Sequence, residues 1–248
     1  MNVYKQILTN KEKNKKQIAV LIDPDKAAGK ELELLCALAQ KAEVDFLFVG
    51  GSLLTNGNIH HCIKSIKNCC NIPVVIFPGS TMQIDGNADA ILFLSLLSGR
   101  NADLLIGKHV MAAPIVKEQK LEAISTGYIL IDGGNITTVQ YISDTKPIPA
   151  DKADITACTA LAGEMLGMKL IFLEAGSGAH IPVNETTIEK VAQTINIPLI
   201  VGGGIRTPEK AMQNFKAGAD MIVIGNLFEK HPSLLMEMAA TRFEYFSK

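Results

Sequence analysis

The sequence contains no tryptophan, and aromatic residues make up only 5% of its 248 positions. Hydrophobic residues nevertheless reach 48%, so we expect a single domain over residues 1–248 with a large, mostly aliphatic core. Long apolar runs are missing as well, because the longest, at residues 91–97, is far too short for a transmembrane helix of about 20 residues. The first 16 residues carry lysines but no apolar segment, so they do not resemble a secretory signal.

An excess of either charge is also absent. The 24 basic and 25 acidic residues give a formal net charge of −1, which predicts no binding to nucleic acid. Cysteine occurs five times, an odd count that favours reduced thiols in the cytoplasm when no secretory signal is present. Cys69 and Cys70 are adjacent rather than spaced as C-x-x-C, so neither a zinc site nor a redox pair is expected.

Eight short segments are continuously apolar and rich in β-branched residues. This pattern is typical of parallel strands that are buried on both faces. Amphipathic stretches of helical period lie between most of them, for example at residues 31–42 and 185–195. The series predicts an α/β fold, and eight units in one domain favour a closed (β/α)8 TIM-type barrel over an open sheet. The predicted strands are residues 17–23, 45–52, 73–79, 90–96, 127–132, 169–176, 198–204 and 221–226.

The connections between these segments are uneven in length. Only ten residues, 80–89, separate the third and fourth strands, whereas a parallel crossover usually needs a dozen or more. We therefore expect a reduced third crossover helix and a thin or grooved barrel wall near Phe77 and Ile84. The connection after the fifth strand, residues 133–152, is long and has few helix signals. Because it follows the end of a strand, where barrel active sites form, we expect it to be a mobile lid that covers the site.

Glycine-rich loops end the last three predicted strands, with GSG at 176–178, GGG at 202–204 and GN at 225–226. Glycine lets the backbone approach a ligand and turn its N–H groups inward, and a helix N-terminus after each loop would favour an anion. A phosphate beyond strands seven and eight is a recurrent ligand of this fold. Three such loops together predict phosphate binding. The alternative is that the glycines only form tight turns.

Two aspartates, Asp23 and Asp25, follow the first predicted strand, and Ser52 ends the second. Mg²⁺ prefers one or two carboxylates together with water and substrate phosphate oxygens. Asp23 lies nearer the barrel mouth and is the better candidate ligand, with the Ser52 hydroxyl beside it. The alternatives are an ion pair between Asp23 and Lys26, and capping of the next helix by Asp25.

Glu174 ends the sixth predicted strand, beside the GSG loop, and follows the apolar Phe172 and Leu173. Side chains alternate along a strand, so Phe172 and Glu174 are expected on the same side. Burial there would raise the pKa of the carboxyl group toward a value suited to a general base. The alternative is a structural carboxylate that holds a loop.

Five motifs fall at the predicted strand ends: LIDPDK at 21–26, FVGGS at 48–52, FLEAGSGA at 172–179, VGGGIR at 201–206 and VIGN at 223–226. Together they resemble the geranylgeranylglyceryl phosphate synthase family over nearly the whole chain. The pairing of LIDPD with LEAGSG is the most specific part, since GGG and GN occur in many phosphate-binding barrels. AGSGA, with TKPIP at 145–149, is similar to the second, larger group of that family.

The resemblance implies a prenyltransferase that joins a polyprenyl diphosphate, with geranylgeranyl diphosphate as the expected donor, to the C3 hydroxyl of sn-glycerol 1-phosphate. It implies Mg²⁺ as cofactor, held by Asp23 and Ser52, and Glu174 as the base that takes the proton from the attacking hydroxyl. Many members have tyrosine where this chain has Phe172, so a phenol hydrogen bond to glycerol phosphate is missing. The residues implied to hold glycerol 1-phosphate are Phe172, Leu173, Glu174, Ala175, Gly176, Ser177, Gly178, Gly203, Gly204, Gly225 and Asn226.

Family resemblance also implies a homo-oligomer, a dimer or a hexamer. Tyr141 in the long connection is a candidate interface anchor and, equally, a candidate part of the lid. The lipid product predicts transient membrane contact without stable insertion, and its prenyl tail needs an apolar channel, which we expect near Phe77 and Ile84. The residues alone leave two alternatives. Another phosphate-binding barrel enzyme, such as an isomerase or synthase acting on a sugar phosphate, would not need Asp23 with Ser52. A non-catalytic phosphometabolite-binding protein would have no use for Glu174.

Overall fold

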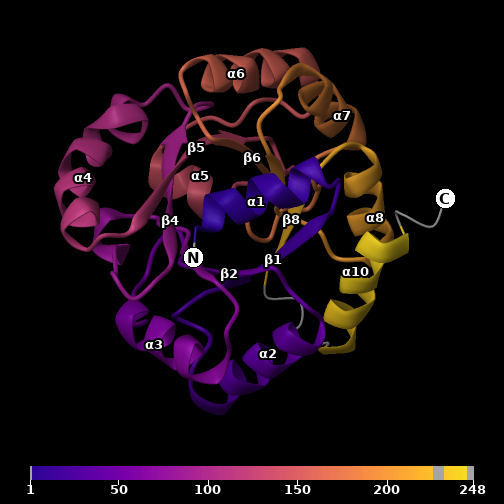
Figure 1. Ribbon diagram of the computed structural model, residues 1–248. Coiled ribbons are helices and arrows are strands. Elements are labelled where there is room, and N and C mark those ends of the chain that lie inside the picture. Colours follow the sequence, from indigo (N-terminus) through magenta and orange to yellow (C-terminus); the bar gives the residue numbers. More distant parts are fainter. Residues whose placement is uncertain (1, 226–231, 245–248) are drawn as a thin grey trace.

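Eight parallel strands close into a barrel in sequence order, with β1 paired to β8. The computed structural model describes residues 2–225 and 232–244. Figure 1 shows the ring of strands surrounded by helices, and it confirms the predicted TIM-type barrel. The strands are β1 (Gln17–Ile22), β2 (Phe46–Val49), β3 (Val74–Ile76), β4 (Ala90–Leu96), β5 (Glu122–Leu130), β6 (Leu170–Glu174), β7 (Leu199–Gly202) and β8 (Met221–Ile224).

Most strands are shorter than the predicted apolar segments at their carboxyl ends. The residues left over, including Asp23 and Ser52, lie in the loops beyond the strands. β5 differs, because it begins at Glu122 rather than at residue 127 and pairs with β4 along the whole length of β4. The sequence did not reveal these additional residues of β5, because several of them are polar and interrupt the apolar pattern.

Helices follow most of the strands. The third crossover is an exception: it holds only η1 (Thr81–Gln83), a single 3₁₀ turn, which confirms the reduced helix. A π-helical turn, η2 (Asp103–Gly107), precedes α4. Within residues 2–225 and 232–244, no helix is both long and apolar enough to span a membrane. The helices are α1 (Val3–Glu12), α2 (Gly29–Lys41), α3 (Ile59–Cys69), α4 (Lys108–Glu118), α5 (Thr138–Ser143), α6 (Ala153–Met165), α7 (Glu185–Thr194), α8 (Pro208–Lys216) and α10 (Pro232–Glu244).

The connection at residues 133–152 contains regular secondary structure that its sequence did not indicate. It contains the short helix α5, and Ile148 forms an isolated parallel bridge with Ile131 at the end of β5. The mobile lid expected for this connection stays a prediction, and the β-branched sequence TVQYIS forms a helix of six residues that the sequence did not signal.

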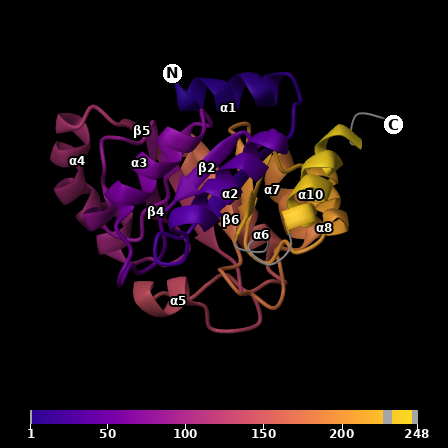
Figure 2. The same ribbon diagram turned by 90° about the horizontal axis from the view of Figure 1, so that it is seen from below.

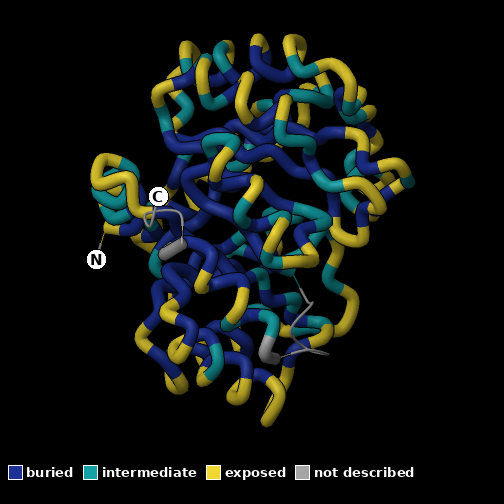
Figure 3. The backbone as a smooth tube through the Cα atoms, turned by 90° about the vertical axis from the view of Figure 1, so that its right-hand side faces the viewer, coloured by how far each residue is buried: buried dark blue, intermediate teal, exposed yellow. Residues whose placement is uncertain are grey.

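Apolar side chains form two layers, one inside the barrel and one between the strands and the outer helices. In Figure 3, the buried segments of the backbone, in dark blue, lie in the interior, and exposed yellow segments lie on the outer turns. α1 closes the end where the strands begin, with Val3 and Ile7 buried in the inner layer. Figure 2 shows α1 and α5 at opposite ends of the barrel.

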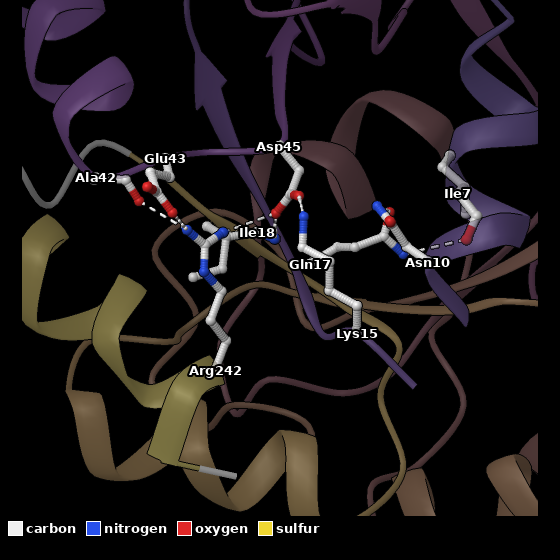
Figure 4. Close-up of polar contacts among 9 residues, drawn as sticks. All are labelled: Ile7, Asn10, Lys15, Gln17, Ile18, Ala42, Glu43, Asp45 and Arg242. Atoms are coloured by element: carbon white, nitrogen blue, oxygen red, sulfur yellow. Dashed lines mark hydrogen bonds and ion pairs between the residues drawn. The ribbon is translucent and has the colours of Figure 1, made fainter. Parts of the chain in front are cut away.

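A polar network ties the chain together at the end where the strands begin (Figure 4). Asp45 is 7% exposed, and it accepts hydrogen bonds from the backbone of Ile18 (3.0 Å), from Lys15 Nζ (3.1 Å) and from Arg242 Nη1 (2.9 Å). Arg242 also donates to the Ala42 carbonyl at 3.0 Å. The network therefore connects the final helix, α10, to the beginnings of the first two strands.

Candidate active site

A cavity of about 1030 Å³ opens at the end of the barrel where the strands finish. Loops after β1, β2, β3, β6, β7 and β8 line it, and residues of α5 also contribute. Of the predicted site residues, it brings together Asp23, Ser52, Glu174, Ser177, Gly178, Gly203, Gly204 and Gly225. The two halves predicted from sequence, strands one and two on one side and strands six to eight on the other, therefore face a single space.

Not all predicted contacts lie on the cavity wall. Leu173 and Ala175 are buried in the outer layer, between the strands and the helices, because strand alternation turns them away from the barrel interior. Phe172 and Gly176 are also buried and do not line the cavity. Asn226 lies outside the described residues.

Glu174 is the last residue of β6, and it is only 6% exposed. Its Oε1 atom accepts a hydrogen bond from the Gly176 amide at 2.7 Å. Burial raises the pKa of the carboxyl group from 4.5 to about 7, and the Gly176 hydrogen bond opposes the rise. Among the described residues, no lysine, arginine or histidine forms an ion pair with Glu174. A carboxyl group with a pKa near neutrality can exchange a proton with a substrate.

The glycines after β7 make room for this carboxylate. A Cβ atom at Gly202 would lie 2.6 Å from Glu174 Oε2, and one at Gly203 would lie 2.5 Å from Oε1. Gly203 also has a φ of +81°, which a residue with a side chain rarely adopts. The GGG sequence is therefore required by the close approach of Glu174 as well as by the turn.

The expected helix dipoles are only partly present at the glycine loops. α7 begins at Glu185, several residues after the GSG segment, and α8 begins at Pro208. Backbone amides of the loops themselves are the nearer donors to an anion. Arg206 adds a cation that the sequence analysis missed: it lines the same cavity and is fixed by a hydrogen bond from Nη2 to the Ala179 carbonyl at 2.8 Å. The sequence offered one indication of this role, because Arg206 directly follows the glycine loop in the motif VGGGIR.

Asp23 and Asp25 have different partners. Asp25 accepts hydrogen bonds from the backbone of Thr55, Asn56 and Gly57, and these bonds, that of Thr55 above all, lower the pKa of its carboxyl group to about 2. It does not cap α2, whose N-cap is Ala28. Asp25 thus holds the loop after β2.

Asp23 accepts a hydrogen bond from the Asp25 amide at 3.1 Å and pairs with Lys26 Nζ at 2.9 Å, as the sequence alternative had it. Its side chain is 22% exposed, toward the cavity that Ser52 also lines. No cluster of three or more acidic, histidine or cysteine ligands occurs in the described part of the chain. One carboxylate and one hydroxyl fit Mg²⁺, which takes its other ligands from water and from phosphate oxygens.

Gln83 is a further residue that the sequence did not reveal. It belongs to η1, is only 3% exposed, and bonds to both loops beside it. Its Nε2 donates to the Gly51 carbonyl at 2.8 Å, and its Oε1 accepts from the amides of Gly51 (3.4 Å) and Gly79 (3.2 Å). The short third crossover therefore fastens the loop that carries Ser52.

Two aromatic rings, those of Phe77 and Tyr128, line the floor of the cavity, and the buried ring of Phe172 packs against both. Phe77 stacks on Phe172 with ring centroids 5.2 Å apart, and Tyr128 meets both rings edge-on at 5.8 and 5.4 Å. Beyond Phe77 the cavity continues along apolar residues of β4 and α4, including Phe93 and Ala112. Phe77 and Ile84 both lie on its wall, where the groove was expected.

Comparisons with known proteins agree on one family. The PcrB family profile matches residues 10–243. A geranylgeranylglyceryl phosphate synthase of Chitinophaga pinensis is 55% identical over 237 residues, covering 96% of this chain and 94% of that protein. One from Pyrococcus furiosus is 44% identical over 216 residues, covering 87% and 85%.

Among solved structures, the (S)-3-O-geranylgeranylglyceryl phosphate synthase of Thermoplasma acidophilum, crystallised in complex with its substrate sn-glycerol-1-phosphate, is similar to this chain with a TM-score of 0.92. The two are 36% identical, and the match covers 98% of this chain and 99% of that one.

Proposed function

The chain belongs to the PcrB family, and we propose that it is a prenyltransferase that alkylates the C3 hydroxyl of sn-glycerol 1-phosphate with a polyprenyl diphosphate. The observation that carries this proposal is the shared cavity, in which a buried carboxylate stands between glycine loops on one side and an apolar extension on the other. A phosphate-bearing acceptor and a prenyl donor would meet there. Loss of diphosphate and formation of the ether bond would follow.

The acceptor half consists of the loops after β6, β7 and β8. Backbone amides near Ser177, Gly203 and Gly225 would bind the phosphate of glycerol 1-phosphate, with the Arg206 cation nearby. The Thermoplasma acidophilum relative was crystallised with this compound, which supports the choice of acceptor. A phosphate fixed at the rim would hold the glycerol hydroxyls over Glu174 and so raise their effective concentration.

Glu174 would accept the proton that the C3 hydroxyl loses as it attacks the allylic carbon. Its pKa of about 7 suits this role, because a sizeable fraction of the carboxyl group is ionised at neutral pH while the group remains a usable base. The Gly176 hydrogen bond orients one oxygen, so the other is free to face the acceptor.

The donor half consists of the loops after β1 and β2. Asp23 and Ser52 would hold Mg²⁺, with Gln83 fixing the loop that carries Ser52. When bound, Mg²⁺ would neutralise the diphosphate leaving group. Lys26 lines the same part of the cavity and offers a second positive charge.

The prenyl chain would extend past Phe77 into the space that the missing third crossover helix leaves open. A paired test uses two neighbours on α4: Ala112 lines the cavity, whereas Ala113 is exposed. We expect Ala112→Phe to shift the preference toward shorter donors, and Ala113→Phe to leave chain length unchanged. If the two variants gave the same distribution of product lengths, the prenyl chain would not bind along this part of the cavity.

Apolar side chains on the outer helices support self-association. Ile106, Val110 and Met111 beside or on α4 are 61 to 68% exposed, and Met165 on α6 is 77% exposed. Burial of such side chains in a homo-oligomer would remove them from water. Tyr141 on α5, at 78% exposure, remains a candidate for an interface or for transient contact with a membrane. Free thiols at all five cysteines suit a cytoplasmic enzyme.

The decisive assay incubates the protein with Mg²⁺, sn-glycerol 1-phosphate and geranylgeranyl diphosphate, and detects the ether product by mass spectrometry. Replacing the acceptor by its mirror image, sn-glycerol 3-phosphate, should lower the yield sharply, and chelation of Mg²⁺ should abolish it. If no donor, of any prenyl length, gave an ether product, the proposed function would be wrong.

A further inference from the structure

Tyr128 presents a phenol to the cavity that has no hydrogen-bond partner among the described residues. The residue lies on β5, lines the cavity and is 6% exposed, so what exposure it keeps faces the cavity. Its ring is held edge-on by Phe77 and Phe172. Within residues 2–225 and 232–244, its hydroxyl forms no hydrogen bond to a protein group, and because the oxygen is not enclosed by protein atoms, it must find its partner inside the cavity. A ligand is the natural partner.

The position of Tyr128 selects one of the two proposed substrates. It pairs in register with Phe172, which is two residues before Glu174 on β6. Burial, and to a lesser extent the negative charge of Glu174, raises the pKa of the Tyr128 phenol well above its usual value, so the group remains a hydrogen-bond donor at neutral pH. The diphosphate would lie across the barrel at Asp23, and a prenyl chain offers no acceptor atom. The hydroxyl oxygens of the glycerol moiety are acceptors of the required kind.

We propose that Tyr128 is a substrate-binding residue of the acceptor site, whose hydroxyl donates a hydrogen bond to the glycerol moiety while the glycine loops hold the phosphate. This inference rests on the proposed function. Tyr128 and Glu174 would then hold the acceptor alcohol from adjacent strands, one as donor and the other as proton acceptor.

The test is Tyr128→Phe, which removes one oxygen atom and keeps the three-ring contact. We expect the Kd of sn-glycerol 1-phosphate, measured by calorimetry, and its KM to rise about five- to tenfold, the effect of one neutral hydrogen bond. The Kd of inorganic phosphate and the KM of the prenyl diphosphate should not change. Tyr4→Phe is the matched control: Tyr4 lies on α1 at the opposite end of the barrel, and its variant should behave as the wild type.

Three results would overturn the assignment: an unchanged Kd for glycerol 1-phosphate, an equal loss of affinity for inorganic phosphate, or a rise confined to the KM of the prenyl donor. Melting of Tyr128→Phe within a degree or so of the wild type would exclude a folding defect as the cause. Calorimetry separates this inference from the proposed function. If the wild type made no ether product, the function would fail, and the comparison of glycerol 1-phosphate with inorganic phosphate would still test Tyr128.

Discussion

The two ends of the barrel bury carboxylates to the same extent and use them differently. Asp45 and Asp220, where the strands begin, are 7% and 8% exposed, and Glu174, where they finish, is 6% exposed. Asp45 has Arg242 and Lys15 as partners, and Asp220 has Lys11 at 2.7 Å. Glu174 has one backbone amide. Burial is equal, so Glu174, the proposed base, differs from the two structural carboxylates in having no cationic partner among the described residues.

This difference follows from what each end must do. An ionised carboxylate surrounded by cations is held in its charged form and links elements that are distant in sequence. Without a cation, burial works against the charge, and the pKa of Glu174 rises to about 7. Barrel folds generally reserve the end where strands finish for chemistry and the other for stability. In this chain the division can be tested by exchanging single atoms at each end.

The largest effect is expected for Glu174→Gln. The amide cannot accept the proton of the attacking hydroxyl, so kcat should fall by about 10²- to 10⁴-fold, the usual contribution of a general base. The Kd of glycerol 1-phosphate should change little, because the amide oxygen of glutamine can still accept a hydrogen bond from the acceptor hydroxyl and the glycine loops remain. Steady-state kinetics and calorimetry on the same preparation give both values. If the variant kept the full rate, Glu174 would have a structural role, like Asp45 and Asp220 at the other end of the barrel.

Arg242→Met should produce the opposite pattern. It leaves Asp45 buried without its main cation, and breaking such a pair costs about 3–5 kcal/mol of unfolding free energy. The kcat at a temperature where the variant is folded should equal that of the wild type. Urea unfolding measures the loss, and Lys152→Met is the control, because the pair with Asp151 is largely exposed and contributes under about 1 kcal/mol. An equal loss in the two variants would contradict the network in Figure 4.

The pH dependence of stability should carry the signature of Glu174. Its folded pKa lies above the unfolded value, so the neutral form stabilises the fold: that contribution is complete below about pH 4.5 and is lost as the pH rises through about 7. The shift corresponds to roughly 3 kcal/mol. The unfolding free energy of the wild type minus that of Glu174→Gln should therefore be larger at acidic than at alkaline pH by that amount.

Activity should run in the opposite direction over the same range, because only the ionised carboxylate is a base. We expect kcat/KM to increase as the pH passes about 7, where stability declines. A rate profile that is flat between acidic and alkaline pH, together with a stability difference that does not change, would show that Glu174 is ionised throughout.

The sequence predicted the parts of this molecule that depend on neighbours along the chain. Continuous apolar segments identify parallel strands, and the strand-end positions of Asp23, Ser52 and Glu174 follow from them. Contacts between distant segments were out of reach: Arg242 meets Asp45 from 197 positions away. The start of β5 was missed because buried polar residues such as Thr126 bond to their own strand and imitate a loop.

The same limit applies within the site. Tyr128 and Gln83 gain their roles from contacts across the barrel mouth and carry no local signal. By contrast, the buried state of Glu174 could be anticipated, since Phe172 and Leu173 precede it at a strand end.

The smallest effect is expected for Gln83→Leu, which asks whether the reactive end also contains purely structural groups. The leucine would remove the hydrogen bonds to Gly51 and Gly79 and leave their partly buried polar atoms without these partners, at a cost of about 1–3 kcal/mol in unfolding free energy. The loop with Ser52 would loosen, so the KM of the prenyl diphosphate should rise several-fold while that of glycerol 1-phosphate stays constant. Met82→Leu, next to it and 90% exposed, is the control. Equal rises in both KM values would mean that Gln83 supports the whole mouth rather than the donor half.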